Sequence, residues 1–275
     1  MSRPSASRRP AAARTLSLLA CALAALPVGG CAGPTHDDVE HIDEALLEDA
    51  VPIGARDADA STSPNTLSEA ERATGWELLF DGASLDAWRN YKVDTLGAAW
   101  AVQDGCLARV ADGAGDIVTR DVFGDFELQV DWRISQGGNS GIMFAVTEDA
   151  EYTFMSGPEM QVLDNEGHGN GLDPLTSAGS NYALHAPAAD VTRAVGEFNH
   201  AYIRRVDDRV EHWLNGTKLL EYELGSPEWQ ALVAASKFAQ WPGYGQAAVG
   251  HIALQDHGDA VWYRNLKVRR LDGTP

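Results

Sequence analysis

Residues 125–135 alternate between polar and apolar side chains with a period of two. The apolar set is Phe126, Leu128, Val130, Trp132 and Ile134, and the polar set is Glu127, Gln129, Asp131 and Arg133. Successive side chains of a strand point to opposite faces, so this pattern predicts a strand with one face in a core and the other toward water or a ligand. Such a strand is typical of a large antiparallel sheet.

Short strand-like runs separated by Gly, Asn and Asp continue from Trp76 to Leu271. The predicted strands are 77–80, 99–103, 116–119, 125–135, 141–147, 159–163, 201–206, 210–214, 218–223, 248–254 and 261–270. Asp207-Asp208 and Asn215-Gly216 lie between consecutive runs and indicate two-residue hairpin turns. So many strands without a blade-like repeat predict an all-β fold, a two-sheet antiparallel jelly roll.

One short helix is predicted within this domain. Ser226 is a favourable N-cap, Pro227 suits the first helical position, and residues 228–238 continue the helix. Residues 165–187 are rich in glycine and poor in apolar side chains, which predicts a long loop. Long loops in compact domains are often functional.

The first thirty residues are typical of an export signal. Four arginines precede the apolar stretch 16–28, which is too short to span a membrane as a helix. It ends in Val28-Gly29-Gly30-Cys31, which matches a bacterial lipobox, so Cys31 is the predicted lipidation site. The alternative is an ordinary signal peptide cleaved near Ala32. We therefore expect an exported protein, lipid-anchored to the bacterial cell envelope at the outer membrane or facing the periplasm.

Residues 31–75 are dominated by acidic side chains and contain no aromatic residue. So little apolar surface cannot offset the entropy of ordering, which predicts a disordered tether. The net charge of −19 opposes binding to nucleic acid or to anionic lipid head groups. The predicted organisation is a lipoprotein signal peptide over 1–30, an acidic linker over 31–75 and the jelly-roll domain over 76–275.

Glu159 and Gln161 are two residues apart, so both project from one face of their strand, while Met160 and Val162 point into the core. A carboxylate beside an amide suits sugar hydroxyls, because both accept hydrogen bonds and the amide also donates. The alternative interpretation is a solvated outer face.

Two further residues allow two interpretations each. His257 follows the 248–254 strand and could be a general base near neutral pH or a histidine bonded to a loop carbonyl. Arg264 lies among residues of core-like parity, which requires either a buried acidic partner or a substrate contact.

The segment Gly137–Gly141 lacks the spacing and the following helix of a phosphate-binding loop. Its glycines permit a close approach of backbone to a sugar, with Asn139 and Ser140 supplying hydrogen bonds. The sequence requires no cofactor and contains no recognised metal motif, although scattered acids and histidines could still hold a divalent metal ion.

Several segments resemble the 3-keto-disaccharide hydrolase family, also described as 3-keto-glucoside 1,2-lyases and 3-keto-2-hydroxyglucal hydratases. The segments are Leu79–Gly82, Leu85–Trp88, Asp125–Leu128, Trp132–Gly141, Glu159–Asp164, Glu211–Gly216, Leu254–Gly258 and Trp262–Asn265. The resemblance covers nearly all of residues 76–271 in order. It implies a concanavalin A-like jelly roll and an enzyme that acts on 3-keto-glycosides.

The chemistry implied by the resemblance is elimination across C1–C2 of a 3-keto-glycoside, followed or not by water addition to the 2-hydroxyglucal product. Its site needs a base, an enolate stabiliser and a donor for the leaving oxygen. Our expected catalytic residues are His257 or Glu159 as base and Arg133 or Arg264 at the enolate oxygen. Expected substrate contacts are Gln161, Asn139, Ser140, Asp164, Arg264 and His212.

The expected partners are a carbohydrate substrate and a separate sugar 3-dehydrogenase that supplies the keto group. Two alternatives remain for the function: a non-catalytic carbohydrate-binding module and a conventional glycoside hydrolase. The second alternative needs a pair of suitably spaced carboxylates, which neither Glu127 with Asp131 nor Glu159 with Asp164 matches well.

Overall fold

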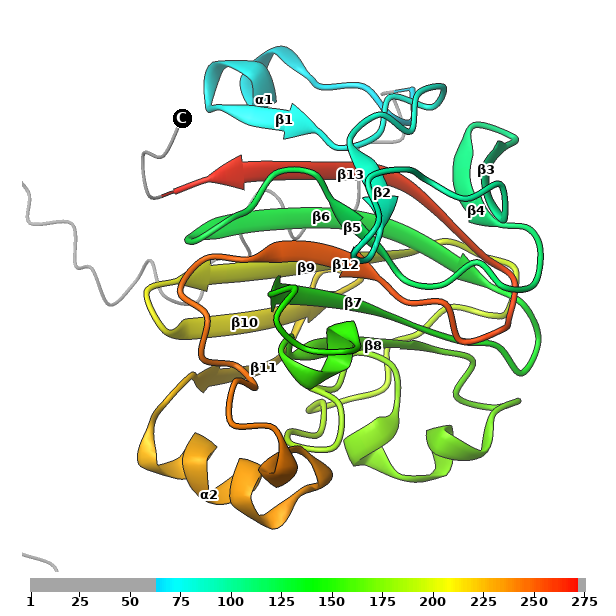
Figure 1. The fold of residues 1–275 in the computed structure, drawn as a ribbon. Helices are drawn as coiled ribbons and strands as arrows, with labels where there is room; N and C mark the ends of the chain where they lie inside the picture. The colour runs from blue at the N-terminus through cyan, green and yellow to red at the C-terminus, as the bar shows by residue number, and fades with distance from the viewer. Residues whose placement is uncertain (1–62, 272–275) are drawn as a thin grey trace, which may run out of the picture. The chain divides into compact units, whose positions relative to one another are not determined.

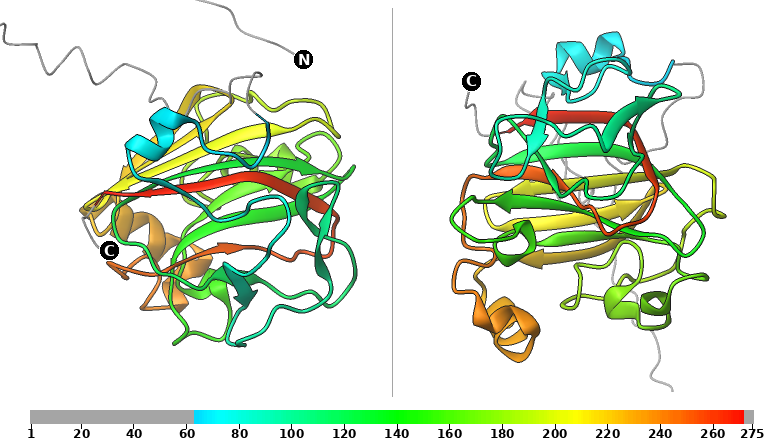
Figure 2. Two further views of the ribbon diagram at one scale, coloured as in Figure 1. Left: turned by 90° about the horizontal axis from the view of Figure 1, so that it is seen from above. Right: turned by 45° about the vertical axis from the view of Figure 1, so that its right-hand side comes forward.

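The computed structural model describes residues 63–271, in which the strands form two antiparallel sheets. Figure 1 shows the two sheets one behind the other, and the view from above in Figure 2 shows them face to face. The larger, 8-stranded sheet contains β1 (Trp76–Leu78), β3 (Trp100–Gln103), β4 (Cys106–Arg109), β6 (Phe126–Ile134), β9 (Asn199–Val206), β10 (Arg209–Leu214), β11 (Thr217–Glu223) and β13 (Val261–Arg270). The 5-stranded sheet contains β2 (Trp88–Asn90), β5 (Ile117–Thr119), β7 (Asn139–Val146), β8 (Glu159–Leu163) and β12 (His251–Leu254).

The core lies between the two sheets. Strand β6 pairs with β9 on one side and β13 on the other, so its apolar side chains lie at the centre of the larger sheet. Phe126 of β6 packs edge to face against Phe144 of β7, which joins the two sheets through aromatic contact. The apolar set of residues 126–134 therefore faces the core, while Glu127, Gln129 and Asp131 on the other face are buried too, and the predicted two-sheet jelly roll is confirmed.

Each of the eleven predicted strands has a counterpart in the structure. Strands β2 and β4, of three and four residues, were not predicted. Both predicted hairpins form: β9, β10 and β11 are joined by two-residue turns. Asn215 and Gly216 adopt positive φ angles of 49° and 79°, which the type I′ turn of a tight hairpin requires.

The predicted helix is α2 (Pro227–Ala235), and the Trp229 N–H donates to the Ser226 side chain at 3.1 Å as an N-cap. Helix α2, orange in Figure 1, lies beside β11 at the edge of the larger sheet. Trp229 stacks on Tyr222 of β11 with ring centroids 5.4 Å apart. A 3-10 turn, η6 (Lys237–Gln240), follows α2 and leads back toward the smaller sheet.

Residues 63–75, which the sequence assigns to the tether, contain a second helix, α1 (Glu69–Ala73). The Asn65 N–H donates to the Asn265 side chain at 2.6 Å, and Lys267 forms an ion pair with Glu71 at 2.7 Å. Composition obscured this contact because its residues are polar and their partners are distant in sequence. The predicted signal peptide, Cys31 and the rest of the linker lie outside the described residues. In the described part of the chain, no helix combines the length and apolar character needed to span a membrane.

Candidate active site

The outer face of the smaller sheet contains a cavity lined by Glu159 of β8, and Gly141 of the neighbouring strand β7 lies against the Glu159 side chain. Gly141 is directly opposite Gln161 of β8, and the Gln255 N–H donates to the Gly141 carbonyl at 3.0 Å. A Cβ atom at position 141 would overlap the carboxyl group of Glu159. Because Gly141 has no side chain, there is space beside it for the Glu159 carboxyl group. The group that comes close to the backbone at this glycine is therefore a carboxyl group.

The cavity has a volume of about 160 Å³. This is below the roughly 300–1,000 Å³ of sites for drug-sized ligands, so it accommodates one small unit rather than a chain. Strands β7, β8 and β12, the 3-10 turns η3 (Thr153–Met155) and η6, and two loops position its lining residues. The lining residues are Asn139, Phe154, Glu159, Gln161, Tyr182, Lys237, Gln255 and His257.

Glu159 is the most perturbed acid of this cavity. Its side chain is buried, with the residue 6% exposed, and burial raises the pKa of its carboxyl group to about 8. The Lys237 ammonium opposes this shift, and the Asp116 carboxylate adds to it. A carboxyl group with a pKa of about 8 is a strong base when it is ionised and a proton donor when it is not.

Two amide oxygens of the cavity have no hydrogen-bond donor among the described residues. They are Oδ1 of Asn139 and Oε1 of Gln255, and both are buried. Buried acceptors are nearly always paired in folded proteins, so a donor is expected from a bound ligand or water. Gln161 is also held in place, because its Nε2 donates to the Thr176 carbonyl at 3.3 Å. The cavity therefore presents acceptors to a ligand that carries hydroxyl groups.

Lys237 and Tyr182 are cavity residues that sequence reasoning missed. The Lys237 ammonium lies 4.3 Å from the centroid of the Tyr182 ring, an arrangement that favours a cation. Desolvation lowers the pKa of Lys237, and the nearby Glu159 carboxylate opposes this. Lys237 follows α2 in η6 and Tyr182 lies in the long loop, so neither shares a strand parity that could have identified it.

His257 is exposed at the rim of the cavity, in the loop after β12. Asp256 fixes this loop by pairing with Arg109 and by accepting a hydrogen bond from the Gly115 N–H at 2.7 Å. The ring of His257 meets that of His168 edge to face, with centroids 6.4 Å apart. The structure thus brings His257 to the same cavity as Glu159, Gln161 and Asn139.

Ser140 points into the core instead. Its hydroxyl donates to the Gln255 carbonyl or pairs with the Tyr263 hydroxyl, each at 2.7 Å. Ser140 and Asn139 are neighbours on one strand, so their side chains necessarily lie on opposite faces. The expected substrate contact from Ser140 is therefore replaced by a structural one that supports the segment bearing Gln255, directly after β12.

Arg133 and Arg264 lie on the outer face of the larger sheet, on the opposite side of the core from Glu159. Their guanidinium groups lie 5.0 and 3.8 Å from the centroid of the Phe198 ring, and Arg264 pairs with Asp131 at 3.3 Å. For Arg264, the sequence allowed either a buried acidic partner or a substrate contact, and the structure shows the acidic partner, Asp131. The alternation of side chains shows which face of a strand is polar, but not which sheet the strand joins. The expectation that Arg133 or Arg264 shares a site with Glu159 is therefore wrong.

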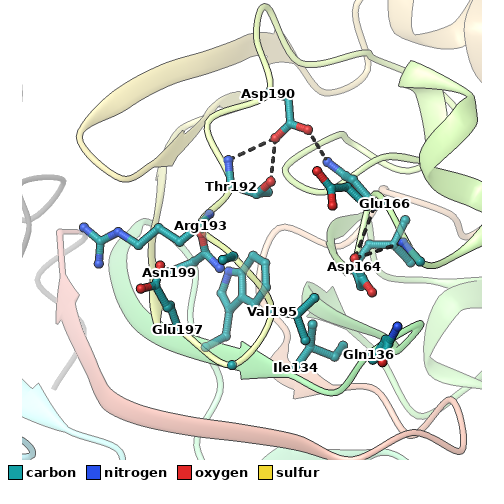
Figure 3. A pocket seen from close by; sticks show the side chains of 16 residues that line it. Ile134, Gln136, Asp164, Glu166, Asp190, Thr192, Arg193, Val195, Glu197 and Asn199 are labelled. Atoms are coloured by element: carbon teal, nitrogen blue, oxygen red, sulfur yellow. Dashed lines mark hydrogen bonds between the residues drawn. The ribbon is translucent and has the colours of Figure 1, made fainter.

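Asp164 lines a different cavity, of about 750 Å³, between the β6–β7 turn and the 190–199 loop (Figure 3). Its carboxylate accepts hydrogen bonds from the N–H groups of Gly137 at 2.6 Å and Gly167 at 3.0 Å. Asp190, across this cavity, is held by both the N–H and the hydroxyl of Thr192. Both carboxylates thus fasten loops, and Asp164 is not brought to the cavity of Glu159.

His212 is fully buried in β10. Its Nδ1 lies 3.2 Å from the Gly179 carbonyl oxygen and its Nε2 lies 3.3 Å from the Tyr222 hydroxyl. Burial lowers the pKa of His212 to about 3, so it is neutral. A substrate contact from this residue, expected from the sequence, is not compatible with its position in the core.

Within residues 63–271, no three His, Cys, Asp or Glu side chains are grouped closely enough to hold a metal ion. The acceptors of the Glu159 cavity are one carboxyl group and amide oxygens, which suit sugar hydroxyls.

Known proteins resemble this chain over most of its length. A 3-keto-disaccharide hydrolase of Bacteroides thetaiotaomicron is 32% identical over 286 aligned positions, which cover 92% of this chain and 98% of that protein. A candidate glycosyl hydrolase of known structure from Parabacteroides distasonis is 33% identical, with a TM-score of 0.72, over 76% of this chain and all of the other. A second such structure from the same organism is 29% identical, with a TM-score of 0.56, over 71% of this chain and 99% of the other.

The family model for the 3-keto-alpha-glucoside-1,2-lyase-like domain matches residues 75–269, which include both sheets except the last residue of β13 and all the residues lining the Glu159 cavity. The chain therefore belongs to the family of 3-keto-alpha-glucoside-1,2-lyase-like domains.

Proposed function

We propose that this protein is an enzyme that cleaves 3-keto-glycosides, such as 3-keto-disaccharides, in the cavity around Glu159. The observation that carries the proposal is a buried carboxyl group with a pKa of about 8 beside a histidine, a lysine and two unpaired amide oxygens. Membership of the family and the name of the Bacteroides relative support a 3-keto sugar as substrate.

The ketone at C3 determines the reaction. It acidifies the hydrogen at C2, so a base can remove that proton and leave an enolate. The C1–O bond then breaks, the leaving oxygen takes up a proton, and a 2-hydroxyglucal with a C1–C2 double bond remains. Addition of water across that double bond places a hydroxyl on C1 and a hydrogen on C2, which completes net hydrolysis.

Each proton has a carrier in the cavity. The Glu159 carboxylate removes the C2 proton, because a base with a pKa of about 8 is well matched to turnover near neutral pH. His257, at the rim, donates a proton to the leaving oxygen and later accepts one from the attacking water. Glu159 returns its proton to C2 in the hydration step, so both groups end in their starting states.

Lys237 stabilises the enolate in this proposal, in place of the two arginines of the larger sheet. Its ammonium lies beside Tyr182 on the cavity wall, where partial desolvation strengthens its attraction for a developing negative oxygen. Asn139 and Gln255 accept hydrogen bonds from the hydroxyl groups of the sugar.

The decisive experiment incubates the purified protein with a 3-keto-glucoside and, in parallel, with its unoxidised parent, each with and without a chelator. Cleavage of the keto form alone is the expected result, and sensitivity to the chelator would assign a divalent metal ion to the reaction. Cleavage of the parent would indicate a conventional glycoside hydrolase. Binding without turnover would indicate a carbohydrate-binding module.

A 3-keto substrate requires an oxidation that precedes this reaction, and we assign it to a separate sugar 3-dehydrogenase. Export and lipid anchoring through Cys31 are proposed on the same footing, from the lipobox alone. They would place cleavage at the bacterial cell envelope.

A further inference from the structure

A second cavity, of about 700 Å³, adjoins the Glu159 cavity. The two share three lining residues, Phe154, Gln255 and His257. The Glu159 cavity has room for one small unit, whereas a disaccharide has two. The second cavity is also lined by Tyr91 and Tyr152.

Tyr152 presents an aromatic surface within this second cavity. Its ring stacks on Phe154 with centroids 5.5 Å apart and planes at 6°, and Phe154 in turn meets Trp241 edge to face at 5.4 Å. Tyr152 is nevertheless 50% exposed, so the stack leaves much of its ring uncovered. Aromatic rings with an exposed face are suited to packing against another ring.

The segment that carries Tyr152 is fastened before any ligand binds. The Tyr91 hydroxyl lies 2.7 Å from the Thr147 carbonyl oxygen and 2.8 Å from that of Ala150, and burial raises its pKa to about 12. The Thr153 hydroxyl donates to the carboxylate of Asp116. A preformed aromatic surface costs little ordering entropy on binding, which favours its use as a binding surface.

Glu148 holds the same segment from the other side. Arg89 pairs with both of its carboxylate oxygens, at 2.7 and 3.0 Å, and the Lys92 N–H donates to one of them at 2.8 Å. Asn90, which lines the cavity, is likewise held in place: its Nδ2 donates to the Ala114 carbonyl at 2.6 Å. Since Asn90 and Asp256 of this cavity already have protein partners, we assign packing on the Tyr152 ring a leading part in recognition here.

We propose that this second cavity is the subsite for the leaving group, and that the leaving group is a second sugar ring packed on Tyr152. The proposal rests on the proposed function, because the second ring is a leaving group only if the 3-keto unit is cleaved in the Glu159 cavity. His257 lines both cavities, so it lies where the glycosidic oxygen must cross from one to the other. That position agrees with its role as proton donor to that oxygen.

The test compares substrates that share one 3-keto-glucosyl unit and differ in the leaving group: methanol, glucose or phenol. Tyr152→Ala is expected to lower kcat/KM for the 3-keto-disaccharide about tenfold, the size of effect typical of ring packing, and to leave the methyl compound within about twofold. Tyr152→Phe keeps the ring and should retain wild-type values. Leu172→Ala removes an exposed apolar side chain that lines neither cavity and is the matched control.

Equal losses for the methyl compound and the disaccharide, or no loss for either, would overturn the subsite. A loss confined to the phenyl compound would also overturn it, because it would assign the surface to an aromatic leaving group. Failure of the proposed function has a different signature, namely no turnover of any 3-keto-glycoside by the wild-type protein. In that case calorimetric titration of the protein with the unoxidised disaccharide and with glucose tests the site. A disaccharide that binds more tightly than glucose to the wild type but not to Tyr152→Ala would support a sugar site at Tyr152. Equal binding of the two sugars to the wild type would reject it.

Discussion

The outer faces of the two sheets look alike in sequence and differ in how their acids are partnered. On the larger sheet, Asp131 accepts hydrogen bonds from His200 and Asn265, each at 2.7 Å, and pairs with Arg264. On the smaller sheet, the carboxyl group of Glu159 has no hydrogen-bond partner among its described neighbours, and burial is the main influence on it.

The pKa values of the two acids shift in opposite directions. Burial alone would raise the pKa of Asp131, but His200, Asn265 and Arg264 outweigh it and lower the pKa below its usual value. For Glu159 only the Lys237 ammonium opposes burial, and because burial is the larger influence the pKa rises to about 8. A partnered acid on a sheet face stabilises the fold, whereas an unpartnered one in a cavity is available for chemistry.

The largest effect is expected from Glu159→Gln. It keeps the shape of the side chain and removes the base, so kcat/KM on a 3-keto-glucoside should fall by about 10²- to 10⁴-fold. Glu166→Gln makes the same chemical change at an exposed acid outside the cavity and should have little effect. Wild-type rates in Glu159→Gln would show that the base is another residue.

Asp131→Ala tests the partnered acid on the larger sheet. It leaves the Arg264 guanidinium and the Asn265 amide without their shared acceptor, which should lower the free energy of unfolding by about 3–5 kcal/mol in urea titrations. Turnover per folded molecule should remain within about twofold of the wild type. A large loss of turnover in protein that is still folded would mean that the larger sheet contributes directly to the reaction.

Because the pKa of Glu159 is raised in the folded protein, we expect stability to decrease as the pH rises. The folded protein holds this proton up to pH about 8, whereas the unfolded chain releases it near 4.5. Stability should therefore fall between these two pH values, by about 1.4 kcal/mol per pH unit from this group, and level off above. Denaturation of the wild type and Glu159→Gln at pH 5, 6.5 and 8 isolates the contribution, because the variant lacks this slope. Parallel curves would show that Glu159 is ionised throughout.

The smallest effect concerns the position of the pH–rate profile. If Glu159 is the base, kcat/KM should rise with pH toward its pKa of about 8. Lys237→Met removes the cation that holds this pKa down, so the rising limb should move to higher pH, together with a loss of rate from the weaker enolate stabilisation. Lys218→Met, on the larger sheet, is the matched control and should leave the limb in place. If the rising limb of the Lys237→Met profile stayed at the wild-type pH, Lys237 would have no influence on the pKa of Glu159.

Sequence reasoning recovered the strands because a period of two is a local property. The parity of strand 159–163 placed Glu159 and Gln161 on one outer face, whereas the expected role of His257 beside them came with the family resemblance. Sequence reasoning could not assign Arg133 to a sheet, because pairing between strands depends on contacts far apart in the chain. Lys237 had no usable signal for the same reason.

Helix α1 had a usable local signal. Ser68 and Glu71 have the three-residue spacing of a capping box, and both hydrogen bonds of that motif form at 3.1 and 2.6 Å. The acidic composition of residues 31–75 outweighed this signal in the interpretation, although polar contacts such as the Glu71–Lys267 ion pair attach the segment to β13.

The contrast between a buried Glu159 and an exposed His257 has a consequence for isotope transfer. His257 exchanges its proton with bulk water freely, whereas a proton taken up by Glu159 is shielded and leaves slowly. If water addition follows elimination during one residence of the sugar, we expect deuterium from C2 of the substrate to return to C2 of the product. If the glucal departs first, the label is lost to solvent. Mass spectrometry of the released sugar would thus report whether elimination and hydration form one uninterrupted event.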